Sequence, residues 1–132
     1  MTQPSFVTHE VFNQSPPFED VDLFAVDLTL IDLTADHSAR FDPNKAYADC
    51  TAAVAHRAPE GSVDMGTGYD CSDLKAHTAA KSIGSAQRRW RNALVAAMAR
   101  QGFVNYSKEW WHFSLPGAAG PAYDFPVTLP RN

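Results

Sequence analysis

The sequence lacks several features that would point to particular classes of protein. It has no basic surplus, because 11 Lys and Arg residues stand against 15 Asp and Glu residues and give a formal charge of −4. A nucleic-acid partner is therefore not indicated. No apolar run is long enough to cross a bilayer. The N-terminus, MTQPSFVTHEVFNQ, is polar and has no apolar core of a signal peptide. We expect a soluble, cytoplasmic protein with neither a nucleic-acid nor a membrane partner.

Cysteine is scarce, and Cys50 and Cys71 are its two occurrences. Disulfides are rare in cytosolic proteins, so we expect both residues to be free thiols. The glycine-bearing segment 62–70, SVDMGTGYD, lacks the lysine of a P-loop and does not match a dinucleotide fingerprint. We interpret it as a tight turn.

Patterns along the 132 residues predict one α+β domain with a core of its own. Residues 1–24 contain Pro16 and Pro17 and predict an extended N-terminal arm. Alternating apolar residues predict a strand near 23–33, and aromatic and branched residues predict another near 107–115. Between them lies a long, loop-like stretch, followed by a helix at about 85–101. We expect the two strands to form a small antiparallel sheet with the helix packed on it.

The helix has clear boundary signals. Ser85 is the predicted N-cap, and Gly102 the predicted stop. Trp90 and Leu94 lie on its apolar stripe at helical spacing. Four arginines lie mostly off that stripe and predict a solvated face: Arg88, Arg89, Arg91 and Arg100. A second, short helix is expected at 46–57.

Two places in these strands could carry chemistry. Asp27 lies among small and apolar neighbours, so its carboxylate needs a metal or hydrogen-bond donors, and the sequence alone leaves both open. Glu109 and His112 flank two tryptophans in EWWH, a pair that suits a zinc site or, alternatively, an amphipathic core strand. Side chains alternate along a strand, so Glu109 and His112 can reach one site only if the strand is irregular or begins after Glu109. An antiparallel pairing would bring Asp27 and His112 together.

From about Ala25 to Leu115 the chain resembles the D-alanyl-D-alanine dipeptidases of the vancomycin-resistance type, zinc peptidases of the D,D-carboxypeptidase and hedgehog-like fold. The matching pieces are AVDLTLIDL (25–33), VDMGTGYD (63–70) and residues 79–115, which include EWWH. The resemblance implies hydrolysis of D-alanyl-D-alanine or a related dipeptide with Zn²⁺ as cofactor.

The same resemblance implies a role for three residues. Asp27 matches the zinc-binding aspartate that ends the family's S-x-H-x-x-G-x-A-x-D motif. His112 matches the zinc-binding histidine of E-x-x-H, and Glu109 matches the general base that activates the zinc-bound water. The motif's own histidine is replaced by Asp20. Zinc also binds carboxylate oxygens, so Asp20 could still be its third ligand. Glu19 and Asp22 are nearby alternatives, and His9 or His37 could supply the ligand from a loop. The other interpretation is that the acidic residues only solvate the arm.

The chain also departs from the family upstream of Asp27. Residues before it do not look like the family segment that supplies a substrate-polarising arginine. Residues 8–24, THEVFNQSPPFEDVDLF, instead resemble the extreme N-terminus of acyl-CoA dehydrogenases of the adaptive-response type. We therefore divide the chain into an arm (1–24), foreign to the family, and a partial dipeptidase-like domain (25–132).

These departures leave a second interpretation open, a catalytically inactive remnant that acts as an interaction module and binds metal weakly or not at all. Loss of covering structure also predicts an exposed apolar patch, including Phe24, Val26 or Trp110, through which the chain could form a homodimer.

Overall fold

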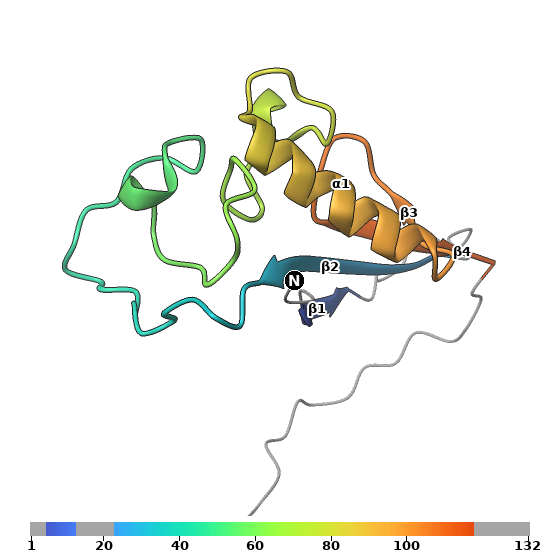
Figure 1. Cartoon of the computed structure of the whole chain (residues 1–132), viewed down its shortest axis with the longest axis horizontal. Coiled ribbons are helices and arrows are strands. Elements are labelled where there is room, and N and C mark those ends of the chain that lie inside the picture. The colour runs from blue at the N-terminus through green and yellow to red at the C-terminus, as the bar shows by residue number, and fades with distance from the viewer. Residues whose placement is uncertain (1–4, 13–22, 118–132) are drawn as a thin grey trace, which may run out of the picture.

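The computed structural model describes residues 5–12 and 23–117, which form one antiparallel sheet with a helix across it (Figure 1). The regular elements are β1 (Ser5–Phe12), β2 (Leu23–Ile31), α1 (Ser85–Ala99), β3 (Val104–Asn105) and β4 (His112–Pro116). The sheet order is β1-β2-β4-β3, and every neighbouring pair is antiparallel. The predicted α+β class, with two paired strands and a packed helix, is confirmed.

Two features of the sheet differ from the expected one. The arm contributes β1, an additional strand that pairs with β2 along Ser5–Phe12 with a shift in register between Thr8 and Glu10. The C-terminal strand begins at His112, later than the predicted residue 107, because the residues before it form a turn. The division of the chain at residue 24 stays a prediction.

Strand β2 is central, which explains its unusual sequence. Residues 25–30 are all buried, on both faces of the strand. A strand enclosed on both faces carries a nearly continuous run of small and apolar residues, and AVDLTL is such a run apart from Asp27. Its even-numbered residues Val26, Leu28 and Leu30 join the main core. Asp27 therefore needs partners on the other face.

Helix α1 covers the sheet from one side (Figure 1). Leu94 is fully buried in the core together with Trp110, Trp111 and Phe113. The N-cap is Gly84, one residue before the predicted Ser85, and its N–H donates to Oε1 of Gln87 at 2.8 Å.

Helix α1 ends at Ala99, two residues before the predicted end, and the stop residue is the predicted one. Gly102 follows the helix with a φ of +85°, a conformation that glycine adopts without strain.

The predicted apolar patch is only partly present. Phe24 is 48% exposed, but Val26 and Trp110 are buried. Val26 lies opposite Phe113 in the core. The indole Nε1 of Trp110 donates to Thr67 Oγ1 at 2.9 Å. Both residues are thus covered by structure within the described chain, and the homodimer stays a prediction.

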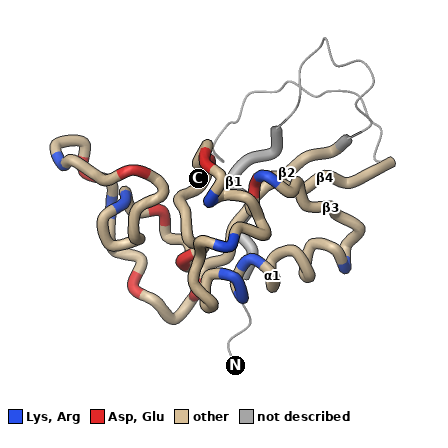
Figure 2. Tube along the Cα trace, turned by 90° about the horizontal axis from the view of Figure 1, so that it is seen from above, with Lys and Arg blue, Asp and Glu red and all other residues tan. Residues whose placement is uncertain are grey.

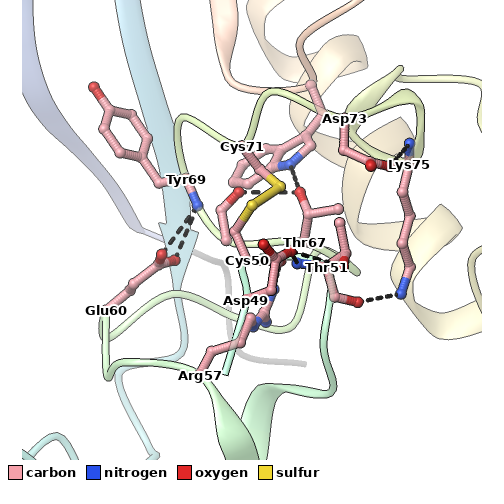
Figure 3. The surroundings of a disulfide bond; sticks show 12 residues. Asp49, Cys50, Thr51, Arg57, Glu60, Thr67, Tyr69, Cys71, Asp73 and Lys75 are labelled. Atoms are coloured by element: carbon pink, nitrogen blue, oxygen red, sulfur yellow. Dashed lines mark hydrogen bonds between the residues drawn. A yellow bond between two sulfur atoms is a disulfide. The ribbon is translucent and has the colours of Figure 1, made fainter. Parts of the chain in front are cut away.

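The long segment between β2 and α1 has little regular structure. The helix expected at 46–57 is wrong, since only a 3-10 turn at Val54–His56 forms there. The expectation of free thiols is also wrong, because Cys50 and Cys71 form a disulfide (Figure 3). Gly68 N–H donates to the Cys50 carbonyl at 2.8 Å, so the two loops already meet at this point. The disulfide therefore joins two irregular segments that hydrogen bonds also connect, among them that from Lys75 Nζ to the Thr51 carbonyl at 2.8 Å.

Arg91 corrects the prediction of a solvated arginine face. Figure 2 shows basic positions, in blue, in the first part of α1, but the Arg91 side chain is fully buried. Its Nε donates to the carbonyl of Met65 at 2.7 Å, Nη1 to that of His77 at 2.7 Å and Nη2 to that of Lys75 at 2.9 Å. The guanidinium thus attaches α1 to the 65–77 loop. Within residues 5–12 and 23–117, no helix is both long and apolar enough to cross a membrane.

Candidate functional site

The site begins where β2 and β4 place Asp27 and His112 directly opposite each other. Paired residues on neighbouring strands project from the same face of the sheet, so their side chains meet. Asp27 Oδ1 lies 2.7 Å from His112 Nδ1, although 85 positions separate the two residues. The predicted meeting of these side chains across the sheet is confirmed.

Glu109 joins this pair from a turn. The carboxylate Oε2 of Glu109 lies 3.9 Å from His112 Nδ1. The Glu109 N–H donates to the Tyr106 carbonyl at 3.0 Å, and the His112 N–H donates to the Glu109 carbonyl at 3.3 Å. The turn therefore directs side chains three positions apart toward one point, where a regular strand would separate them. Glu109 precedes the regular part of the strand, as the site interpretation required.

The surroundings of Glu109 make it a stronger base than an ordinary glutamate. Partial burial raises the pKa of its carboxyl because the charged form loses hydration. His112 opposes the shift, while the negative charges of Asp27 and Asp70 add to it. A carboxylate with a raised pKa accepts a proton more readily, which suits a general base.

Tyr69 is a site residue that the sequence analysis missed. Its phenolic Oη donates to Asp27 Oδ2 at 3.3 Å, so each carboxylate oxygen of Asp27 has a partner. The Tyr69 ring lies against Trp111 with centroids 5.8 Å apart, and its backbone N–H faces both carboxylate oxygens of Glu60 at 3.0 and 3.2 Å. Figure 3 shows Glu60 directed at this N–H. The segment 62–70, interpreted as a tight turn, also delivers this hydroxyl to the site.

The donor set can be compared with the needs of a zinc ion. Zinc takes imidazole nitrogen and carboxylate oxygen, and a catalytic site has three protein ligands and an open position. Asp27 Oδ1 and His112 Nδ1 face each other as one such pair. Asp20, the predicted third ligand, lies outside the described residues, as do Glu19 and Asp22. The described residues thus offer two donors of the types that zinc binds, which is fewer than a catalytic site needs.

A different group of possible ligands lies at the disulfide. Among the described residues, Asp49, Cys50 and Cys71 are the one set of three whose ligand atoms lie within 4.8 Å of one another. Zinc binds thiolates, but both sulfurs are joined in the disulfide. This group therefore cannot act as a thiolate site in the oxidised protein.

Comparisons with known proteins agree with the motifs. Residues 32–129 match the model of the peptidase M15 family, described as D-ala-D-ala dipeptidase. This range includes Glu109 and His112 and begins after Asp27. The resemblance of residues 8–24 to acyl-CoA dehydrogenases falls largely outside the described residues and stays a prediction.

Individual relatives match over shorter stretches. A D-alanyl-D-alanine dipeptidase of Escherichia coli (strain K12) is 46% identical over 57 residues, 43% of this chain and 30% of that protein. One from Enterococcus faecalis (strain ATCC 700802 / V583) is 42% identical over 53 residues, 40% of this chain and 26% of that protein. One from Enterococcus faecium is 39% identical over 67 residues, 49% of this chain and 33% of that protein. The chain thus spans about a third or less of the length of these relatives. With a family match that covers most of its residues, the chain belongs to the D-ala-D-ala dipeptidase family, peptidase M15.

Proposed function

We propose that this chain hydrolyses D-alanyl-D-alanine or a related dipeptide, with a zinc ion held by Asp27 and His112 and with Glu109 as general base. The observation that carries the proposal is the meeting of Asp27 with two groups from a distant part of the chain, Glu109 and His112. Asp27 Oδ1 and Glu109 Oε2 lie 2.7 and 3.9 Å from the same atom, His112 Nδ1. The names of the relatives supply the substrate class, since each is called a D-alanyl-D-alanine dipeptidase.

Asp27 and His112 are the residues that would hold the metal. Asp27 is 7% exposed, and its carboxylate accepts from Tyr69 while it faces the imidazole. A ligand oriented by a second hydrogen bond binds a metal in a fixed direction. When bound, zinc polarises a carbonyl and lowers the pKa of a coordinated water.

Glu109 is the group that would move the proton. Burial raises the pKa of its carboxyl, so it can take a proton from a water beside His112 and pass it to the leaving amine of the dipeptide. Its side chain is partly open to solvent, at 37% exposure, which leaves room for substrate to approach. Glu109 thus acts as base and then as acid in one hydrolysis.

The third ligand is the weakest part of this site. We propose Asp20, because it occupies the position of the family's histidine. A site with two carboxylates and one imidazole carries more negative charge than the family's own set and would tolerate harder cations. Replacing Asp20 by His should therefore tighten zinc binding.

Zinc content of the purified, dialysed protein tests the proposal directly. We expect about one zinc per chain, lost in His112→Ala and retained in Glu109→Ala. Asp49→Ala is the matched control, because the Asp49 carboxylate accepts from Thr51 in its own turn and belongs to the group at the disulfide. Hydrolysis of D-Ala-D-Ala should require both Glu109 and His112. Absence of zinc and of hydrolysis in all variants, Asp20→His included, would reject this proposal in favour of an inactive remnant.

The disulfide is relevant to the cellular compartment of the chain. Disulfides persist in oxidising compartments and are rare in the cytosol. The cytoplasmic location stays a prediction, and the Cys50–Cys71 bond weighs against it. Alkylation of free thiols in intact cells distinguishes the two cases, because only reduced cysteines would be labelled.

A further inference from the structure

The turn that carries Glu109 needs support from elsewhere, because it belongs to no helix or strand. Residues 106–111 lie between β3 and β4 as turns and irregular backbone. Carbonyl groups outside a regular strand need donors, and the Trp111 carbonyl finds one in the Leu28 N–H of β2 at 3.0 Å. The position of Glu109 relative to His112 depends on which donors bind them.

One side chain serves two carbonyls of this segment and that of His112, the first residue of β4, which also accepts from the Tyr106 N–H at 2.9 Å. Nδ2 of Asn105 lies 3.1 Å from the carbonyl oxygen of Glu109, 3.1 Å from that of His112 and 3.5 Å from that of Trp110. The two hydrogens of this amide are thus directed at the start, middle and end of the segment that presents the candidate base and the candidate ligand. Three neighbouring acceptors also fix which end of the amide is nitrogen.

The other end of the Asn105 amide is fixed as well. Thr78 Oγ1 donates to Asn105 Oδ1 at 2.6 Å, and the Thr78 N–H donates to the Ser107 carbonyl at 3.0 Å. Asn105 itself is held in β3, where it pairs with Phe113 of β4. The amide therefore has one orientation, set from a loop far away in the sequence.

We propose that Asn105 is a positioning residue that holds the 106–111 turn in the shape that directs the Glu109 carboxylate at His112 Nδ1. The inference rests on the proposed function for its effect on catalysis. The Asn105 amide bonds neither Oε2 of Glu109 nor the imidazole, since the three partners of its Nδ2 are backbone carbonyls and Oδ1 accepts from Thr78. Its loss should therefore disturb the distance between base and ligand and leave the β2–β4 pairing of Asp27 with His112 in place.

Asn105→Asp is the sharpest variant, because aspartate has the same shape and keeps the acceptor for Thr78, but it replaces both donors by a charged acceptor that repels the three carbonyls. Asn105→Ala removes the whole amide. The matched control is Asn92→Ala, at an exposed position of α1. We expect kcat for D-Ala-D-Ala to fall about 10–100-fold in both Asn105 variants, the range typical of residues that orient a site. KM and Zn²⁺ stoichiometry should stay close to those of the unchanged chain and of Asn92→Ala.

Amide hydrogen exchange on the metal-free protein provides a readout that needs no catalysis. The N–H groups of Glu109 and His112 should exchange at least about 10-fold faster in Asn105→Asp, while those of α1 should not change. Faster exchange with an unchanged kcat would overturn the positioning role, and unchanged exchange would overturn the inference altogether. If the unchanged chain neither binds Zn²⁺ nor hydrolyses the dipeptide, the proposed function fails, and a structure of Asn105→Asp decides whether Glu109 has moved away from His112.

Discussion

Replacing Arg91 by methionine should destabilise the domain more than the loss of any other arginine in α1. The guanidinium is fully buried and donates three hydrogen bonds of 2.7 to 2.9 Å to backbone carbonyls. Burial and the neighbouring Arg88 lower the pKa of Arg91 to about 10, so the group is still charged at pH 7. Hydrogen bonds from a charged group contribute roughly 1.5–3 kcal/mol each, but their loss also relieves the cost of burying the cation. We expect a net loss of about 3–5 kcal/mol.

Urea denaturation of the metal-free protein, followed by circular dichroism, measures this loss. Methionine keeps the unbranched stem of arginine, so packing changes little while the three donors disappear. Arg89→Met is the control, because Arg89 is exposed on the same helix, and it should stay within about 0.5 kcal/mol of the unchanged protein. A domain of this size has on the order of 5–15 kcal/mol in total, so Arg91→Met should still give a measurable transition at low temperature.

The location of the three carbonyls adds a second expectation. Met65, Lys75 and His77 belong to the loop that also carries Tyr69 and Cys71. In Arg91→Met, hydrogen exchange should increase in this loop before it increases in β2. A loss below about 1 kcal/mol, with no change in the loop, would show that the three hydrogen bonds do not hold in solution and would refute the reasoning.

Three further perturbations follow from single contacts. Replacing Cys50 and Cys71 by serine should lower the free energy of unfolding by about 3 kcal/mol in urea, because the bond closes a loop of 21 residues; an equally stable double variant would contradict this. Glu109→Gln should stabilise the metal-free protein at pH 7 but not well below pH 4.5. The raised pKa of the Glu109 carboxyl means that the folded state binds more protons than the unfolded chain, so the carboxyl costs stability as the pH rises. Thermal melts with EDTA at the two pH values test the sign. Thr67→Val should cost about 1–3 kcal/mol in urea by leaving the buried Trp110 indole N–H without its 2.9 Å acceptor, whereas no change would mean that water replaces the hydroxyl.

Local patterns in the sequence predicted the strands and the helix because these depend on short-range signals. The alternation in β2 and the 3.6-residue spacing in α1 each show within the short stretch of sequence that forms the element. The meeting of Asp27 with His112 followed from antiparallel pairing, and the placement of Glu109 before the strand followed from side-chain alternation. Each of these steps needs only neighbouring residues and one assumption about which strands pair.

Features that depend on distant partners were missed. Arg91 has the same local pattern as Arg88 and Arg89, and only the carbonyls of the 65–77 loop explain its burial. The Cys50–Cys71 bond was missed because the expectation of a cytosolic protein, in which disulfides are rare, outweighed the presence of two cysteines. Tyr69 lies in a glycine-bearing segment, and nothing in that segment alone indicates that its hydroxyl reaches β2.

The separation of 85 positions between Asp27 and His112 has a consequence for how the protein becomes functional. During synthesis, β2 leaves the ribosome long before β4, so one half of the site waits for the other while almost the whole domain is made. Contacts that close so large a loop form late, because chain entropy opposes them until local structure has reduced the search. The disulfide, which spans 21 positions, can form earlier and shorten the remaining search. A nascent chain that ends before His112 would therefore have a helix and a crosslink but no site.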